Sequence, residues 1–407
     1  MNRRSSDSAI KPSALFLSPE APYPPIGGGP LRSASLLEYL ARSYDVHLVT
    51  FREAGATDPT VAIPAGKVSQ TGVIELPYHS KRAISRLARN ATRLVRGAPP
   101  LVDRFAGFEP KLQSLLAGNR YDLAIVEHFW CAPYLALIRS HCSRVVLDLH
   151  NIESAWYATA ARNSGSLRRA ALYRFAAASK RLERELLPNF DWLLVASLED
   201  SRRVHELAAG VRVLIYPNAL PEMPAPVKSE REEIAFSGNL EYAPNVEAVR
   251  FFHSQIWPRL RARNKLKWRI IGKNPHAIAS IVGNDPQIEL TGFVEDAVTE
   301  LARAQVAVAP VMSGSGTRVK ILEAWAAATP VVSTSLGAEG LGNPIGQLLI
   351  ADHPRQFASA VERLLDSPEE RRRIGCAGRL LYEQRYTWPA AWRSLRALLV
   401  ETPRREP

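Results

Sequence analysis

Short apolar, β-branched runs alternate with helical segments along almost the whole 407-residue chain. Ranges 46–51, 122–127 and 306–310 have the composition of buried strands, whereas 31–42 and 319–328 carry helical spacing. A chain that alternates strands and helices in this way folds into parallel sheets covered by helices on both faces. The sequence therefore predicts an α/β protein built from Rossmann-like, doubly wound domains.

Proline residues mark the clearest break in this alternation. Four of them lie close together: Pro217, Pro221, Pro224 and Pro226. Proline blocks helix continuation, so we expect an N-terminal domain over 12–219, a linker over 220–233 and a C-terminal domain over 234–385. A last helical segment, 386–407, is expected to pack back toward the N-terminal domain. The two domains would face each other across a cleft at the carboxyl ends of their strands.

The chain is basic, with a formal net charge of +12. Such a field favours an anionic partner: nucleic acid, a nucleotide phosphate or an acidic membrane. Nucleic acid is not expected, because no helix-turn-helix, zinc-finger, RNP or OB pattern accompanies the basic residues.

Cysteine usage and apolar run lengths bear on the compartment. The three cysteines are far apart, which favours a reducing environment. No run approaches the roughly 20 apolar residues that a membrane span needs. We therefore expect a cytoplasmic protein, peripheral on the inner face of the membrane.

A glycine-rich loop, Pro-Pro-Ile-Gly-Gly-Gly-Pro at 24–30, follows the first predicted strand. The glycines, Gly28 and Gly29 among them, let backbone amides approach a phosphate or a sugar at a helix start. The spacing is neither the dinucleotide fingerprint nor a Walker loop, which disfavours a dehydrogenase. The alternative is a plain flexible turn.

Two histidines, His128 and His150, each follow a predicted strand, 122–127 and 145–149. Neutral imidazole can hydrogen-bond an acceptor hydroxyl or take its proton near pH 7. The alternative is a structural hydrogen-bonding role. The chain lacks a zinc-type ligand spacing and any Asp-x-Asp pair, so no metal site is expected.

The run 309–324 carries the most specific pattern in the chain. A buried strand ends, a Ser/Gly turn follows, and a helix begins with the cations Arg318 and Lys320. Cations at a helix start oppose the macrodipole, so their presence there indicates a bound phosphate. Glu323, one turn further on, is placed to accept hydrogen bonds from ribose hydroxyls. The alternative is a solvated basic helix end.

Two further turns of the second half follow predicted strands, 237–245 with Asn239 and 272–275 with Lys273. Both are expected to line the same rim as the run 309–324, because the carboxyl ends of parallel strands meet at one edge.

The segment 80–96 has the pattern of a basic amphipathic helix. Its apolar face is formed by Ile84, Leu87, Ala88, Ala91, Leu94 and Val95. Arginines gather on the opposite face. We expect Lys81–Arg96 to contact an anionic membrane surface. The alternative is a surface helix with a solvated arginine face.

Taken in order, these motifs resemble the family 4 glycosyltransferases of the GT-B fold, especially bacterial sugar transferases of polysaccharide assembly. The resemblance spans nearly the whole chain. Its motifs are Pro-Pro-x-Gly-Gly with Arg32, Glu-His-Phe-Trp at 127–130, His-Asn-Ile-Glu at 150–153, Gly-Asn-x-x-Tyr at 238–242, Gly-Ser-Gly-Thr-Arg-Val-Lys-Ile-Leu-Glu at 314–323, and Tyr-Thr-Trp at 386–388.

The resemblance implies retaining transfer of a sugar from a nucleotide-diphosphate donor to a saccharide or lipid-linked acceptor. No obligatory metal and no other cofactor are implied. Its catalytic residues would be His128, Arg318, Lys320 and Glu323. Its donor-binding residues would be Gly28, Gly29, Asn239, Lys273, Ser315, Gly316 and Thr317, with Arg32 and His150 on the acceptor side.

The chain also departs from the family pattern. Ser315 stands where the first acid of the family's E-x7-E motif is expected, and Asn239 stands where many relatives carry a diphosphate-binding arginine. The first departure leaves open a second reading, a catalytically silent relative that binds a nucleotide sugar or a glycan.

Overall fold

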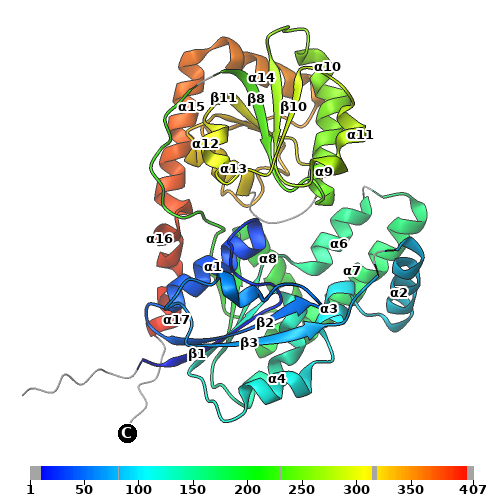
Figure 1. Cartoon of the computed structure of the whole chain (residues 1–407), viewed down its shortest axis with the longest axis vertical. Coiled ribbons are helices and arrows are strands. Elements are labelled where there is room, and N and C mark those ends of the chain that lie inside the picture. Colours follow the sequence, from blue (N-terminus) through cyan, green and yellow to red (C-terminus); the bar gives the residue numbers. More distant parts are fainter. Residues whose placement is uncertain (1–10, 81, 163, 230, 314–318, 401–407) are drawn as a thin grey trace, which may run out of the picture.

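The computed structural model describes residues 11–80, 82–162, 164–229, 231–313 and 319–400, which form two α/β domains, one above the other in Figure 1. The N-terminal domain is a seven-stranded parallel sheet in the order β3-β2-β1-β4-β5-β6-β7. Its strands are β1 (Ser13–Ser18), β2 (Asp45–Glu53), β3 (Gln70–Leu76), β4 (Leu123–Glu127), β5 (Val145–Leu149), β6 (Trp192–Val195) and β7 (Val213–Ile215). Every residue of β4 and β5 is buried, as expected for a sheet covered on both faces.

Helices cover both faces of this sheet. They are α1 (Gly28–Leu40), α2 (Ala83–Arg96), α3 (Pro100–Phe105), α4 (Glu109–Leu116), α5 (Leu135–Arg139), α6 (Glu153–Arg162), α7 (Ser166–Leu186) and α8 (Leu198–Leu207). Short 3-10 turns lie at Pro59–Ala62, Phe129–Tyr134 and Leu187–Asn189. The predicted helical stretch from 153 to 187 is thus divided into α6 and α7, with Gly165 capping the start of α7.

The C-terminal domain is a six-stranded parallel sheet in the order β10-β9-β8-β11-β12-β13. Its strands are β8 (Arg231–Ser237), β9 (Lys267–Ile271), β10 (Ile288–Gly292), β11 (Ala304–Ala309), β12 (Val331–Ser333) and β13 (Leu349–Ile350). Its helices are α9 (Ala243–Phe251), α10 (Trp257–Leu260), α11 (Ala279–Val282), α12 (Ala297–Leu301), α13 (Val319–Ala326), α14 (Pro354–Asp366) and α15 (Pro368–Leu381), with a π-turn at Phe252–Ile256 and a 3-10 turn at Pro275–Ala277.

Both sheets contain the strand order of doubly wound folds, in which the first strand lies beside the fourth. The order reverses between β1 and β4 in one domain and between β8 and β11 in the other. Ligands of such folds bind outside the carboxyl ends of the strands at this reversal. The predicted architecture of two Rossmann-like α/β domains is confirmed.

The end of the chain crosses from the upper domain to the lower one, from α15 into the red segment of Figure 1. This segment contains a π-turn (Tyr382–Tyr386), α16 (Trp388–Ala391), a 3-10 turn (Trp392–Leu395) and α17 (Arg396–Val400). Its Trp392 Nε1 donates to the backbone oxygen of Ser35 in α1 over 3.0 Å. The chain therefore passes between the domains twice, once before β8 and once after α15.

The domains meet through the loops at the carboxyl ends of their strands. A Cβ placed on Gly28 would lie 3.7 Å from Cγ2 of Val319, the first residue of α13. Leu31 of α1 packs into an apolar cluster of the C-terminal domain, and Arg203 of α8 forms an ion pair with Glu339. The two reversal points consequently face each other.

Within the described ranges, no helix is long and apolar enough to cross a membrane.

Candidate active site

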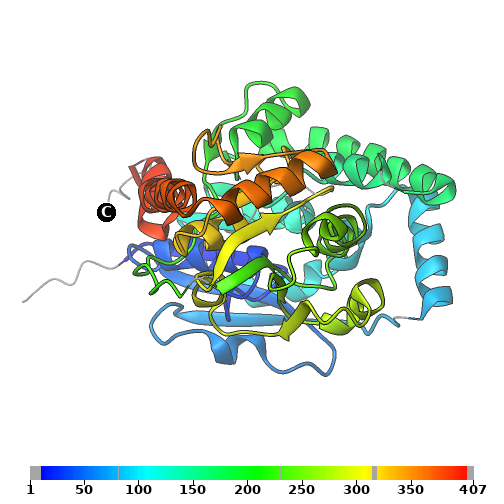
Figure 2. The ribbon, with the colours of Figure 1, turned by 90° about the horizontal axis from the view of Figure 1, so that it is seen from above.

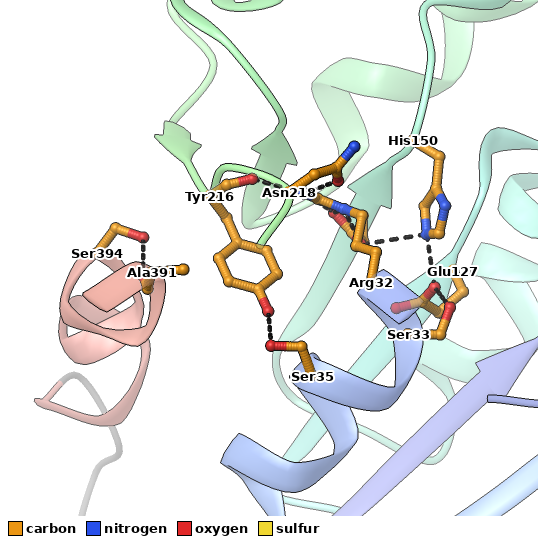
Figure 3. Close-up of polar contacts among 10 residues, drawn as sticks. Arg32, Ser33, Ser35, Glu127, His150, Tyr216, Asn218, Ala391 and Ser394 are labelled. Carbon is orange, nitrogen blue, oxygen red and sulfur yellow. Dashed lines mark hydrogen bonds and ion pairs between the residues drawn. The ribbon is translucent and has the colours of Figure 1, made fainter. Parts of the chain in front are cut away.

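A buried polar network lies at the carboxyl end of the N-terminal sheet (Figure 3). Arg32 of α1 reaches Asp148 of β5, with its Nη2 2.5 Å from Oδ1 and its Nε 2.8 Å from Oδ2. Its Nη1 donates to the backbone oxygen of Tyr216 over 2.5 Å and to Oδ1 of Asn218 over 3.1 Å. Arg32 is only 2% exposed. In this structure Arg32 therefore donates inside the fold, to Asp148, Tyr216 and Asn218, and its contact with the acceptor stays a prediction.

Arg32 fixes the charge of Asp148. Burial alone would raise the pKa of the Asp148 carboxyl, but the Arg32 charge and the His150 hydrogen bond hold it well below its usual range. The carboxylate is therefore ionised at neutral pH and offers His150 a second anionic neighbour.

His150, directly after β5, lies between two carboxylates. Its Nε2 is 2.7 Å from Oε2 of Glu127 and 3.4 Å from Oδ2 of Asp148. The same Glu127 oxygen accepts a hydrogen bond from the Ser33 hydroxyl. Burial lowers the pKa of His150, but the two carboxylates outweigh it and raise the value to about 9. His150 is therefore an imidazolium at neutral pH.

His128 is held next to this imidazolium in an unusual backbone conformation. Its φ is +60°, which is rare for a residue other than glycine and marks a local constraint. Its ring stacks on His150 at 3.6 Å between centroids and on Trp130 at 4.1 Å. Burial, together with the His150 charge, lowers its pKa well below the usual value. His128 is therefore neutral and can serve as a hydrogen-bonding group toward a sugar.

Gly29 lies over the nitrogen edges of both rings. A Cβ added there would lie 3.9 Å from Nε2 of His128 and from Nδ1 of His150, and 3.4 Å from Oε2 of Glu20. The structure thus brings the predicted residues Gly29, His128 and His150 together. Sequence reasoning missed Glu127 and Asp148, although each lies within two positions of a strand-end histidine.

Glu127, His128 and His150 could each offer a ligand atom to a metal, and these atoms lie within 4.8 Å of one another. A metal requires neutral imidazole, whereas the carboxylates here favour a proton on His150. The donor set therefore fits a proton better than a metal ion.

The C-terminal domain contributes a second cluster, around Lys320 of α13. Its Nζ donates to Oδ1 of Asn245 over 2.6 Å and lies 4.1 Å from the centre of the Phe236 ring. One turn on, Glu323 accepts a hydrogen bond from the Ser237 hydroxyl over 2.8 Å. Burial raises the pKa of Glu323. A cation and an oxygen acceptor are thus brought together where β8 ends.

The loops after β8 and β9 touch at their glycines. A Cβ on Gly272, whose φ is +153°, would lie 1.9 Å from the backbone oxygen of Gly238. Asn239 uses its Oδ1 to accept from Nδ2 of Asn274 over 3.1 Å, which ties the two loops together. Lys273 in the second loop is exposed. Asn239 and Lys273 therefore lie on one rim with Lys320. The predicted residues Ser315, Gly316, Thr317 and Arg318 lie outside the described residues.

We expect the stability of the folded protein to fall in two steps as the pH rises. Burial raises the pKa of Glu153 from 4.5 to about 7, so the stabilisation present below 4.5 is lost as the pH passes 7. The pKa of His150 is raised from 6.5 to about 9, so its stabilisation is present below 6.5 and lost through pH 9. The second step lowers the free energy of unfolding by about 3 kcal/mol.

Denaturant unfolding between pH 4 and pH 10 measures both steps. Glu153→Gln is expected to remove the lower step and His150→Gln the upper one. An upper step that persists in His150→Gln would contradict the assignment of the proton to this imidazole.

Comparison with solved structures identifies the fold first. The fold matches that of sucrose-phosphate synthase from Thermosynechococcus elongatus, with a TM-score of 0.74 at 15% identity over 96% of this chain and 99% of that one. It also matches Anabaena HepE, whose structure contains UDP and glucose, with a TM-score of 0.63 at 13% identity over 96% of this chain and 100% of that one. WaaG, a glycosyltransferase involved in lipopolysaccharide biosynthesis, gives a TM-score of 0.63 at 14% identity over 96% and 100% of the two chains.

Residues 231–367 match the family model described as glycosyl transferases group 1. The chain is also 24% identical to an uncharacterized 44.6 kDa protein in the cps region of Klebsiella pneumoniae, over 85% of this chain and 89% of that one. The predicted GT-B fold and the likeness of residues 231–367 to glycosyl transferases group 1 are therefore confirmed.

Proposed function

We propose that the protein is a retaining glycosyltransferase that moves a sugar from a nucleotide-diphosphate donor to a saccharide or lipid-linked acceptor. One observation carries this proposal: Lys320 and Glu323 lie together at the end of β8. Both belong to the part of the chain that matches the glycosyltransferase family. A cation for a diphosphate and an acceptor for ribose hydroxyls are the groups that a nucleotide-diphosphate sugar requires.

The proposed reaction takes place on one face of the donor sugar. The bond from the anomeric carbon to the diphosphate breaks while the bond to the acceptor oxygen forms on the same face, which retains the configuration. The leaving phosphate takes the acceptor proton. Lys320, together with Arg318 two positions earlier in the sequence, stabilises the negative charge on the departing diphosphate.

The N-terminal network supports this single-step course. Glu127 and Asp148, the two carboxylates that contact His150, are engaged by His150, Ser33 and Arg32, so neither of these two is free to attack the sugar. The neutral His128 is left to hydrogen-bond the sugar and so position it. We propose that no metal is needed, because cationic side chains serve the diphosphate.

A panel of nucleotide sugars tests the proposal. Bound donor should raise the melting temperature by mass action, and mass spectrometry should detect sugar transfer or slow donor hydrolysis. Activity should survive EDTA. Glu323→Ala should weaken donor binding. Donor binding without transfer or hydrolysis for any member of the panel would instead favour the silent relative.

We also propose that α2 contacts an anionic membrane on the cytoplasmic side. The arrangement of its faces differs from that of an ordinary surface helix: Ile84, Leu87 and Val95 are 84%, 73% and 89% exposed, whereas Arg93 is buried. Figures 1 and 2 place α2 at the outer edge of the N-terminal domain, beside α7. Leu167 of α7 is 91% exposed as well. An exposed apolar stripe among arginines matches the surface of an acidic bilayer.

Leu87→Asp is expected to reduce co-sedimentation with phosphatidylglycerol vesicles at low salt by about tenfold, because one buried leucine contributes about 1.5–3 kcal/mol. Val61→Asp is the matched control: Val61 is 84% exposed, but in the turn at Pro59–Ala62, away from α2. Equal binding of the two variants, or no binding by the unaltered protein, would contradict the proposal.

A further inference from the structure

A second binding space lies beside the histidines, on the same edge of the N-terminal sheet. It is a cavity of about 310 Å³. It is lined by residues that follow the strands and by residues of α2 and α3, among them Glu53, Arg89, Arg93, Arg104, Phe105 and Trp130. Among the described residues, the predicted donor-side groups Lys320 and Glu323 lie in the C-terminal domain and do not line this cavity, so it can serve another part of the reaction.

Two residues connect the cavity with the candidate active site. Trp130 lines the cavity and stacks on His128 with 4.1 Å between ring centroids. Glu20 also lines the cavity, and its Oε2 lies 3.4 Å from a Cβ position on Gly29 that is 3.9 Å from Nε2 of His128. A molecule seated in the cavity would therefore lie next to the imidazole that we propose to position the sugar.

Three guanidinium groups, those of Arg89, Arg93 and Arg104, line the cavity together with the carboxylates of Glu20 and Glu53. Arg93 pairs with Asp103 over 2.8 Å and Arg104 with Glu53 over 2.7 Å. Burial lowers the pKa of His79, the positive charges of Arg104, Arg89 and Arg93 lower it further, and Glu53 opposes them.

Of the three arginines that line the cavity, Arg89 is the one outside the ion pairs described above. Its Nη2 donates to the backbone oxygen of Ser80 over 2.8 Å, and in the described part of the chain it takes part in no ion pair. Arg104 holds a carboxylate that is 59% exposed, so a stronger anion can replace it. Guanidinium groups present paired N–H donors in the geometry that phosphate oxygens accept.

Aromatic rings form another part of the lining. Trp130 and Phe105 stack almost in parallel, with 5.7 Å between centroids and 6° between ring planes, and Phe105 is buried. The two rings give the cavity an apolar side that suits the carbon skeleton of a ligand next to its phosphate.

We propose that this cavity binds the phosphate group of the acceptor, so that the acceptor is a phosphate- or diphosphate-bearing molecule held by Arg89 and Arg104 against Trp130. The inference rests on the proposed function, since it names the acceptor class for that reaction. Two sources carry this chemistry: a lipid-linked diphosphate and a soluble sugar phosphate. The inner face of α2 lines the cavity and its outer face is the exposed apolar stripe, so a phosphate at a bilayer surface would arrive at this position.

Equilibrium binding of two probes tests the proposal: farnesyl diphosphate for the lipid-linked source and glucose 6-phosphate for the soluble one. We expect saturable binding of one of them by the whole protein. Arg89→Gln and Arg104→Gln should each weaken it about tenfold, since each variant loses charge-assisted hydrogen bonds to the phosphate. Arg168→Gln, which removes an exposed arginine of α7, is the matched control and should leave binding unchanged.

Binding of farnesyl diphosphate alone would support the proposal and assign a lipid-linked acceptor, whereas binding of glucose 6-phosphate alone would support it and assign a soluble one. Failure of both probes, or equal binding by Arg89→Gln and the unaltered protein, would overturn it. Nucleotide-sugar binding is measured in the same variants by melting temperature. Intact donor binding without probe binding rejects this cavity while leaving the proposed function standing. Probe binding without any donor binding rejects the proposed function instead.

Discussion

Lys320→Ala is expected to slow sugar transfer about 100- to 1,000-fold, the usual loss when one preorganised charge-stabilising donor is removed. The Lys320 ammonium is held in place by Asn245 and by the Phe236 ring, beside the glycine loop that ends β8. It would meet the diphosphate as negative charge develops on it. The loss should therefore appear mainly in kcat, with a smaller change in KM for the donor. Initial rates with the donor found in the panel measure both constants.

Lys267→Ala is the matched control for this prediction. Lys267 is exposed at the first residue of β9, at the opposite end of the same sheet. Its loss removes one positive charge from the C-terminal domain but none from the candidate site, so the rate should stay within about twofold, the scale of a screened surface charge. Thermal unfolding of both variants separates lost chemistry from lost folding. An unchanged kcat in a folded Lys320→Ala protein would remove Lys320 from the mechanism.

Arg32→Ala is expected to lower the free energy of unfolding by about 3–5 kcal/mol, because removing one partner leaves a buried, uncompensated charge. Both side chains of the Arg32–Asp148 pair are at most 1% exposed. The variant also loses the bonds from Nη1 to Tyr216 and Asn218, which join α1 to the chain just before the C-terminal domain. Urea unfolding at pH 7 measures the change.

Arg263→Ala provides the comparison for a pair at the surface. Arg263 and Asp366 lie 2.8 Å apart, but their side chains are 33% and 62% exposed. Such a pair contributes about 0–1 kcal/mol. The double replacement Arg32→Met with Asp148→Leu should recover part of the loss, since an apolar pair leaves no buried charge. A cost for Arg32→Ala no larger than that for Arg263→Ala would show that the buried network does not hold the fold together.

The strand pattern was enough to predict both sheets, because fully buried parallel strands are short, continuous apolar runs with turn residues at their ends. The strand-end rule also placed His128, His150 and Gly29 near one another. The role of Arg32 could not be predicted from its position in the motif. Whether an arginine faces a ligand or a carboxylate depends on Asp148, which is 116 positions away in the chain.

The orientation of α2 could not be predicted from the sequence, for a similar reason. Helical spacing shows that Ile84, Leu87 and Val95 share a face, but not which face the domain covers. The domain covers the side that carries Arg89 and Arg93, because Asp103 of α3 is there to pair with Arg93. The cavity beside Trp130 depends on the same long-range packing, so its lining could not be read from any one motif.

The double passage of the chain between the domains determines how they can move. Where the two passages meet, Leu220 pairs with Thr387 as a β-bridge; its N–H donates to the oxygen of Tyr386 over 2.9 Å, and its oxygen accepts from the N–H of Trp388 over 2.8 Å. A single connecting segment would let one domain rotate freely relative to the other. We expect two segments that are hydrogen-bonded to each other to act as a hinge. They would allow the two domains to open and close and would resist rotation of one domain relative to the other. Lys320 in the C-terminal domain and His128 in the N-terminal domain would then come into the same relative position each time the domains close.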